Sequence, residues 1–350
     1  MLVHLTDARS ALRMAIRTIL AGLGNRPKLG VARCLDIGKM KEVFRKELEL
    51  RRVKESVGFS DFRGGAVSLY GTVGAVNICQ VLGFDHGSWD DRQKRAERIL
   101  SFQDDDFSFP PPDSKAHALC MVLQALNILG ANIPEEVQPL APLDVQGLRE
   151  VLRDHDWAST HKELWGMTAP LLATGTPDKE WRDSLLDVLG QRLTLLASPV
   201  TWSGADMAPA RLISCMYHIF QIYDAGRVPL PKADLILKRL LGLDWPLVRQ
   251  REGRTYCTDA DWAWMLSEVV KQSPRMYPLV SSSILKVSRQ RVLEWNLGRV
   301  ELAQMSTHHL YCYLWSTALF QDLDRAGFVG SYIMDTLNQP AFFRLGRSPM

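Results

Sequence analysis

Eight charged or imidazole side chains interrupt long apolar segments of this chain. Imidazole and carboxyl groups are the types that transfer protons in enzymes. They are His117, His161, Arg211, His218, Asp259, Asp261, His308 and His309. A buried histidine bonded to a neighbouring carbonyl is commoner than a catalytic one, so each residue alone would mean little. Because they come from five of six apolar segments, together they predict a shared cavity.

A second acidic feature is the stretch QDDDF at residues 103–107. Its aspartates, Asp104, Asp105 and Asp106, could bind a metal or a diphosphate, donate a proton, or cap the following helix. A diphosphate site of the DDxxD type needs carboxylates spaced along one helix face, and consecutive loop residues fit that poorly. The roles of Asp104 and Asp105 stay open at this point.

The elements that position these residues are expected to be helices, because the apolar segments recur every 45 to 52 residues. The segments begin near Gly65, Ser114, Ser159, Asp206, Thr258 and Ser306. Each is apolar nearly all round, as in a helix packed on both sides. Several open with Ser, Thr or Asp, the usual N-cap residues. Several end at a glycine, namely Gly83, Gly130, Gly175 and Gly226.

A more charged, amphipathic segment precedes each apolar one, which suits an outer position. Six alternating outer and inner helices predict an all-α fold, an (α/α)6 toroid, or barrel, of six helical hairpin repeats around a central cavity. A straight solenoid of hairpins is the competing architecture, but its inner helices are usually more polar on the concave face. We expect residues 1–50 to form an N-terminal helical extension and residues 51–350 a single toroid domain.

The composition excludes several classes of protein. A net charge of +3 over 350 residues, without a long basic run, does not indicate nucleic-acid binding, although peripheral membrane contact stays open. The six cysteines are scattered and suggest free thiols in a reducing compartment. No apolar run approaches the ~18 residues of a membrane span. We expect a cytoplasmic protein, and the oligomeric state is not indicated.

One repeat carries a recognisable motif. The stretch RAERILSFQDDDFSF, followed by an apolar segment, resembles a repeat of the prenyltransferase β-subunit and squalene-cyclase superfamily. Gln103, Asp106 and Phe109 hold the Gln, Asp and aromatic positions, whereas Phe107 and Ser108 replace glycines. The resemblance implies an α/α toroid and a structural role for Gln103 and Asp106.

The same resemblance selects a candidate acid in the stretch TDADWAWML, residues 258–266. Class II terpene cyclases of this barrel type carry an Asp-x-Asp-Asp motif whose middle aspartic acid protonates an alkene or epoxide. The resemblance implies that Asp261 is this acid and Asp259 its partner, with Trp262 in place of the last aspartate. Helical spacing puts Trp264 and Glu268 on the face of Asp261. A capping role is an alternative for Asp259.

Aromatic rings would stabilise the carbocations of such a reaction. We expect the cavity to be lined by His117, His161, Trp165, Arg211, His218, Trp264, Glu268, His308, Tyr311 and Trp315. No cofactor is firmly indicated. Mg²⁺ is compatible with the resemblance, whereas the prediction is against Zn²⁺, although Cys257 lies in a repeat comparable to the zinc-binding ones of the protein prenyltransferases.

The leading hypothesis is an isoprenoid-handling enzyme, a terpene cyclase of isomerase or lyase type that acts on a small hydrophobic substrate. One alternative is a carbohydrate enzyme, a glycoside hydrolase, lyase or epimerase with paired carboxylates. The candidate carboxylates for it are Asp104, Asp105, Asp154, Asp156 and Asp206. Another alternative is a non-catalytic toroid that binds a peptide or a hydrophobic ligand.

Overall fold

The computed structural model describes residues 34–53, 56–103, 114–132, 141, 144–156, 161–175, 177–198, 207–245, 256–323 and 328–329. Helices dominate these residues, which confirms the predicted all-α class. Most of the expected N-terminal extension, and the motif residues Asp106 and Phe109, lie outside the described ranges.

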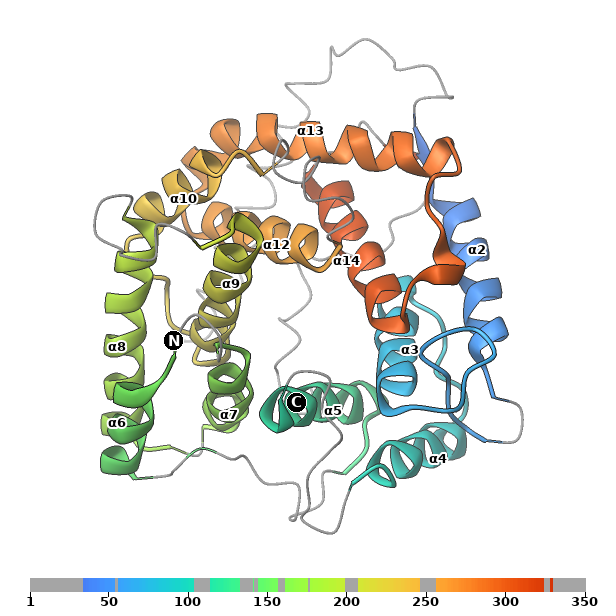
Figure 1. Ribbon diagram of the computed structural model, residues 1–350, viewed down its shortest axis with the longest axis horizontal. Coiled ribbons are helices and arrows are strands. Elements are labelled where there is room, and N and C mark those ends of the chain that lie inside the picture. The colour runs from blue at the N-terminus through green and yellow to red at the C-terminus, as the bar shows by residue number, and fades with distance from the viewer. Residues whose placement is uncertain are drawn as a thin grey trace, which may run out of the picture.

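All six apolar segments form long helices. They are α3 (Leu69–Leu82), α5 (Lys115–Leu129), α7 (His161–Thr174), α9 (Pro209–Ala225), α12 (Tyr256–Gln272) and α14 (Thr307–Leu323). Each packs against the next one in this order, and α14 packs against α3, so their contacts close into a cycle (Figure 1). We call these the inner helices. Most of their residues are buried, as the apolar pattern predicts.

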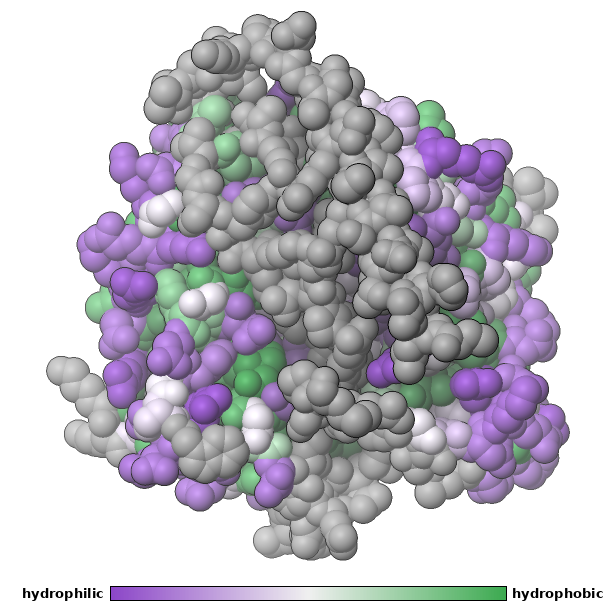
Figure 2. Space-filling model, turned by 180° about the vertical axis from the view of Figure 1, so that it is seen from behind, coloured by the Kyte–Doolittle hydropathy of each residue, from purple (hydrophilic) through white to green (hydrophobic). Residues whose placement is uncertain are grey.

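A second set of helices lies around the inner ones (Figure 1). They are α2 (Ile37–Arg51), α4 (Trp89–Leu100), α6 (Val145–Asp154), α8 (Lys179–Ala197), α10 (Ala233–Gly242) and α13 (Tyr277–Asn296). Seen from behind, hydrophilic side chains gather at both lateral edges of the molecule, where outer helices lie (Figure 2). None of the described helices is long and apolar enough to cross a membrane.

Short elements complete the described structure. Two 3-10 turns, η2 (Pro274–Met276) and η3 (Leu302–Gln304), lead into α13 and toward α14. The strands β1 (Leu35–Asp36) and β2 (Phe328–Val329) pair in parallel, so the chain before α2 lies beside the chain after α14.

Several ends of the inner helices follow the expected capping chemistry, and the C-terminus of α9 differs from it. Ser114 accepts a hydrogen bond from the His117 amide, as an N-cap should. Gly83 and Gly130 end α3 and α5 with left-handed φ angles of 65° and 69°. Gly226 ends α9 with φ −75°, and the left-handed residue there is Arg227, with φ 54°.

Two glycines allow inner helices to approach closely. A Cβ atom on Gly166 of α7 would lie 2.1 Å from the Ala116 carbonyl oxygen of α5. A Cβ atom on Gly74 of α3 would lie 2.8 Å from Cγ2 of Thr307 on α14. Such distances are well below van der Waals contact, so both helix pairs depend on the absence of a side chain there.

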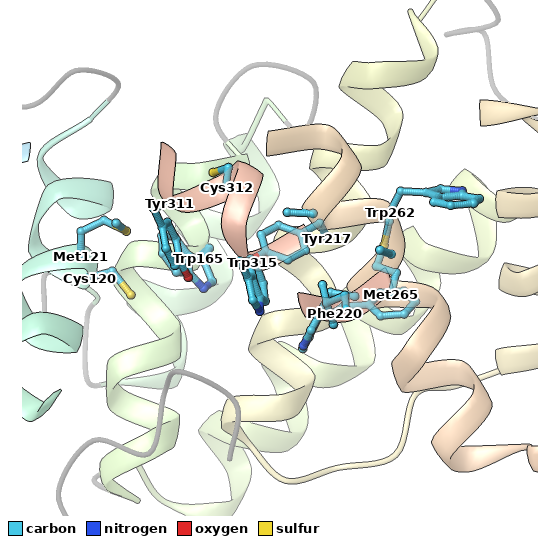
Figure 3. Close-up of a cluster of buried hydrophobic side chains, with 14 of the residues drawn as sticks. Cys120, Met121, Trp165, Tyr217, Phe220, Trp262, Met265, Tyr311, Cys312 and Trp315 are labelled. Atoms are coloured by element: carbon cyan, nitrogen blue, oxygen red, sulfur yellow. The ribbon is translucent and has the colours of Figure 1, made fainter. Parts of the chain in front are cut away.

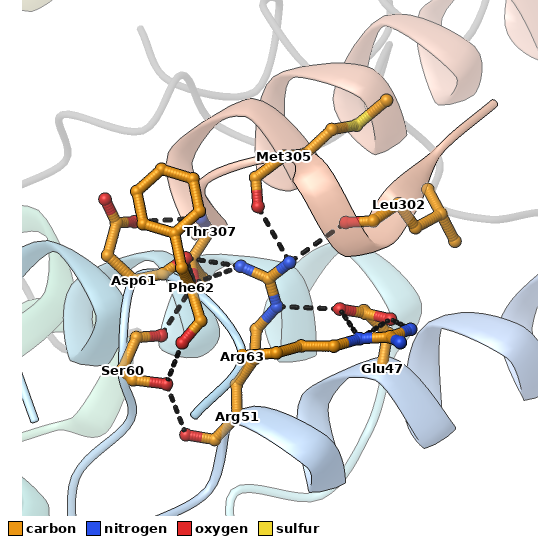
Figure 4. Close-up of polar contacts among 9 residues, drawn as sticks. All are labelled: Glu47, Arg51, Ser60, Asp61, Phe62, Arg63, Leu302, Met305 and Thr307. Carbon is orange, nitrogen blue, oxygen red and sulfur yellow. Dashed lines mark hydrogen bonds and ion pairs between the residues drawn. The ribbon is translucent and has the colours of Figure 1, made fainter. Parts of the chain in front are cut away.

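A buried arginine joins the first described helix to the last one (Figure 4). The guanidinium of Arg51, at the end of α2, donates to the carbonyl oxygens of Leu302 and Met305 at 3.0 and 2.7 Å. It also donates to the Thr307 hydroxyl at 3.2 Å and to Glu47 at 2.9 Å. Arg51 is thus a polar clamp between α2 and the entry to α14.

Candidate active site

Imidazole and indole side chains from three inner helices meet around His218 of α9. Its ring centroid lies 5.1 Å from that of His161 and 5.2 Å from that of Trp165, both on α7. His117 of α5 lies 5.5 Å from Trp165 and 6.5 Å from His218. These four residues were all predicted to line one cavity, and the fold brings them together.

Tyr217 links this group to the aromatic residues of α12 and α14. Its ring lies 5.4 Å from Trp264 and 6.3 Å from Trp315, both at steep angles. Tyr311 stacks on Trp315 at 5.9 Å with an interplanar angle of 5° (Figure 3). His308 lies 6.4 Å from Tyr311. The result is a continuous cluster of buried aromatic rings that spans α9, α12 and α14.

Asp261 places a carboxyl group beside this cluster. It lies in the second turn of α12, one turn before Trp264, and only 8% of its surface is exposed. Its carboxyl group forms no hydrogen bond or ion pair within the described residues. Burial, and then the negative charge of Cys257, raise the pKa of Asp261 well above its usual range. A raised pKa favours the protonated form of Asp261, which is the form that a general acid needs.

Asp259, two residues earlier, has a different environment. Its carboxylate accepts a hydrogen bond from Arg291 of α13 at 2.6 Å and one from the Trp245 indole at 3.0 Å. Both members of the Asp259–Arg291 ion pair are fully buried. Asp259 therefore anchors α12 to α13. It does not act as the N-cap of α12, which begins three residues before it.

His218 is held as a neutral base. Its Nδ1 lies 2.6 Å from the Ser214 carbonyl oxygen, which can only accept, so Nδ1 carries the hydrogen and Nε2 keeps a lone pair. Burial, and then the neighbouring His161, lower the pKa of His218 well below its ordinary value. The same cluster of inner helices thus holds an imidazole that favours its neutral form and a carboxyl group that favours its protonated form.

Two cysteines and a histidine converge where α12 meets α14. The side-chain ligand atoms of Cys257, His308 and Cys312 all lie within 4.8 Å of one another. The Cys312 sulfur is 3.6 Å from Nε2 of His308. A hydrogen bond from Cys312, opposed by burial and reinforced by His308 and His309, lowers the pKa of the Cys257 thiol well below its ordinary value. Of the two thiols, Cys257 is the one whose thiolate form is favoured.

Some predicted residues do not join the cluster. Arg211 is exposed at the start of α9, and Glu268 binds Lys271 on its own helix. Asp156 is exposed. Asp104, Asp105 and Asp206 lie outside the described residues, so the carboxylate pairs expected of a carbohydrate enzyme are not described.

Sequence reasoning missed Cys312 and Lys162. Cys312 lies four residues after His308, a spacing that puts two side chains on one helix face, and this signal was available. Lys162 follows His161, and its charge acts on Asp261, His218 and His308. Whether the Lys162 side chain lies near these groups depends on how α7 is rotated about its axis. The sequence does not indicate that rotation.

Comparison of the chain with models of protein families, with curated proteins and with solved structures finds no match in any of the three. The site must therefore be interpreted from its own geometry.

Proposed function

We propose that the protein is an isoprenoid-handling enzyme, a class II-type terpene cyclase in which Asp261 donates the initiating proton. The supporting observation is a buried carboxyl group without a fixed partner beside a cluster of aromatic rings. Protonation of an alkene needs an acid that keeps its proton and is not tied up in an ion pair. The raised pKa of Asp261, and the lack of an ion pair to its carboxyl group among the described residues, support this role.

In this proposal the six outer and six inner helices form an (α/α)6 toroid, and the substrate lies along the inner helices. The closed cycle of contacts among the inner helices supports this architecture over an open solenoid. The small hydrophobic substrate would place one double bond at Asp261. A cytoplasmic location fits the six free cysteines.

The reaction begins when the Asp261 proton adds to a double bond and leaves a tertiary carbocation on the substrate. The faces of Trp264, Tyr311 and Trp315 stabilise the positive charge as it moves with ring formation. The cation is quenched when a neighbouring carbon loses a proton, for which the lone pair on Nε2 of His218 is a suitable acceptor. The His218 imidazolium then releases this proton to solvent and the Asp261 carboxylate takes one up, so both groups return to their starting states.

Asp259 has a supporting role in this proposal. The ion pair with Arg291 fixes the first turns of α12 and thereby the position of Asp261. In this proposal Asp261 donates the proton, and Asp259 holds α12 in place through its ion pair with Arg291.

The test is turnover of farnesyl and geranylgeranyl diphosphates, with the products identified by mass spectrometry. Asp261→Asn keeps the shape of the side chain but has no acidic proton, so we expect cyclised product to fall by at least ~100-fold. Asp183→Asn, on the exposed face of α8, is the matched control and should keep full activity. Equal turnover in Asp261→Asn and wild type would remove Asp261 as the acid.

A further inference from the structure

The group formed by Cys257, His308 and Cys312 has the donor atoms and the spacing of a metal site. Cys257 comes from the first turn of α12, whereas His308 and Cys312 come from successive turns of α14. Three ligand atoms from two packed helices lie within 4.8 Å of one another. Because α12 and α14 pack closely against each other, the three donor atoms are held in a fixed arrangement.

The distances agree with tetrahedral coordination. Zinc binds thiolate sulfur at about 2.3 Å and imidazole nitrogen at about 2.0 Å, so sulfur and nitrogen on one tetrahedron lie roughly 3.6 Å apart. The observed separation between the Cys312 sulfur and Nε2 of His308 is 3.6 Å. The remaining pairs need to shorten by at most about 1 Å, which side-chain rotation allows.

The donor types select the metal. Two thiolates and one imidazole favour a soft or borderline ion such as Zn²⁺, whereas Mg²⁺ and Ca²⁺ prefer oxygen donors. Cys257 and His308 are partly exposed, so an ion can reach the group. His309, the neighbour of His308 on α14, also lowers the pKa of Cys257 and would support that sulfur from outside the coordination sphere.

We propose that Cys257, His308 and Cys312 bind one Zn²⁺ ion at the junction of α12 and α14, with the fourth position open to water or to a ligand. Three protein ligands and one open position are the pattern of zinc sites that take part in binding or chemistry, whereas four protein ligands make a structural site. The proposal does not depend on terpene cyclisation, because the three ligands are not the side chains that donate or accept a proton in that reaction.

The test measures zinc itself and needs no substrate. The full-length protein, reduced and freed of metal, is titrated with Zn²⁺ in competition with a chromophoric chelator, and bound metal is counted by mass spectrometry. Wild type should bind about one Zn²⁺ per chain. With Co²⁺ in place of Zn²⁺, it should show the near-ultraviolet charge-transfer band of a cobalt thiolate.

Single variants identify the ligands. Cys257→Ser, Cys312→Ser and His308→Gln should each lose more affinity than the ~10 to 100-fold that removal of an outer-shell partner causes. His309→Gln should lose affinity within that smaller range. Cys215→Ser, which removes a buried thiol of α9 outside the group, is the matched control and should bind zinc as wild type does.

Circular dichroism confirms that each variant is folded, so that loss of zinc is not loss of structure. Failure of folded, reduced wild type to bind Zn²⁺ would overturn the proposal. So would unchanged affinity in the two cysteine variants, or a metal-free Cys257–Cys312 disulfide as the resting form of freshly purified protein.

Discussion

Asp259 and Asp261 show how far two neighbouring carboxyl groups can differ. The side chain of Asp259 is satisfied by Arg291 and Trp245, whereas Asp261 lies among groups that oppose its ionisation. The resemblance implied that Asp261 would be the acid and Asp259 its partner, with a capping role as the alternative for Asp259. The partners of the two side chains come from distant segments, so the difference between their environments could not be predicted from the motif alone.

The first prediction concerns the pH dependence of stability at Asp261. Its pKa is raised on folding, so the folded state keeps a proton that the unfolded chain releases, and stability is lost as pH rises above the ordinary carboxyl pKa toward the folded one. Asp261→Asn removes this loss. The variant should gain stability over wild type as pH rises above the ordinary carboxyl pKa of about 4, by at most about 1.4 kcal/mol per pH unit.

Urea unfolding at several pH values measures this difference. Lys162 favours the ionised form of Asp261, whereas Cys257 and Asp259 oppose it. The change of the stability difference with pH therefore reports the net effect of these three charges. A wild type that becomes more stable than Asp261→Asn as pH rises would show that the carboxyl group is ionised in the folded protein.

The second prediction concerns the Asp259–Arg291 ion pair. Removing one member leaves a buried charge without its partner, which costs about 3–5 kcal/mol. Asp259→Asn and Arg291→Gln should each destabilise by this order, and the double variant by less than the sum of the two. A double-mutant cycle in urea checks this, and simple additivity would contradict a direct pairing.

At the scale of elements, the sequence predicts the helices better than their contacts. All six apolar segments form helices, because small and apolar residues on every side suit burial between neighbours. The positions of glycines in the sequence predicted several helix ends. At the end of α9, however, the left-handed conformation falls on Arg227, one residue after Gly226. The rotation of each helix decides which residues meet, and an apolar pattern on all sides does not specify it.

The third prediction tests the approach of α5 and α7. Gly166→Ala would put a methyl group 2.1 Å from the Ala116 carbonyl oxygen, so the helices must separate, at a cost of about 1–3 kcal/mol. Gly242→Ala, at the end of α10, meets nothing within 4 Å and should stabilise by up to about 1 kcal/mol. Thermal unfolding of the two variants should therefore shift in opposite directions. A stabilised Gly166→Ala would contradict the close packing.

At the scale of the whole molecule, the spacing of the segments predicts a ring, and its closure depends on residues far apart in sequence. Gly74 meets Thr307, and Arg51 binds the carbonyl oxygens before α14. Arg51 ends an ordinary amphipathic stretch, so nothing in its neighbourhood indicates a buried clamp. The six apolar segments could be located from the sequence, but the contacts between α14 and α3 that close the cycle could not.

The fourth prediction tests that clamp. Arg51→Lys keeps the charge but cannot reach the Leu302 and Met305 carbonyls together with Glu47. Buried acceptors left without donors cost about 1–3 kcal/mol each, so we expect a loss of about 3 kcal/mol and faster amide exchange at the start of α14. Arg63 is half-exposed and binds the same glutamate, Glu47, so Arg63→Lys should reduce the free energy of unfolding by less than about 1 kcal/mol. Equal losses in the two variants would show that Arg51 does not clamp the ring.

The most direct test of the proposed function is turnover of a prenyl diphosphate in D₂O. If Asp261 exchanges its proton with solvent and then protonates the substrate, each cyclised product molecule should carry one deuterium at the carbon first protonated. Asp261→Asn should form no cyclised product, labelled or not. A cyclised product without deuterium, or full turnover by Asp261→Asn, would contradict the assignment of Asp261 as the proton donor.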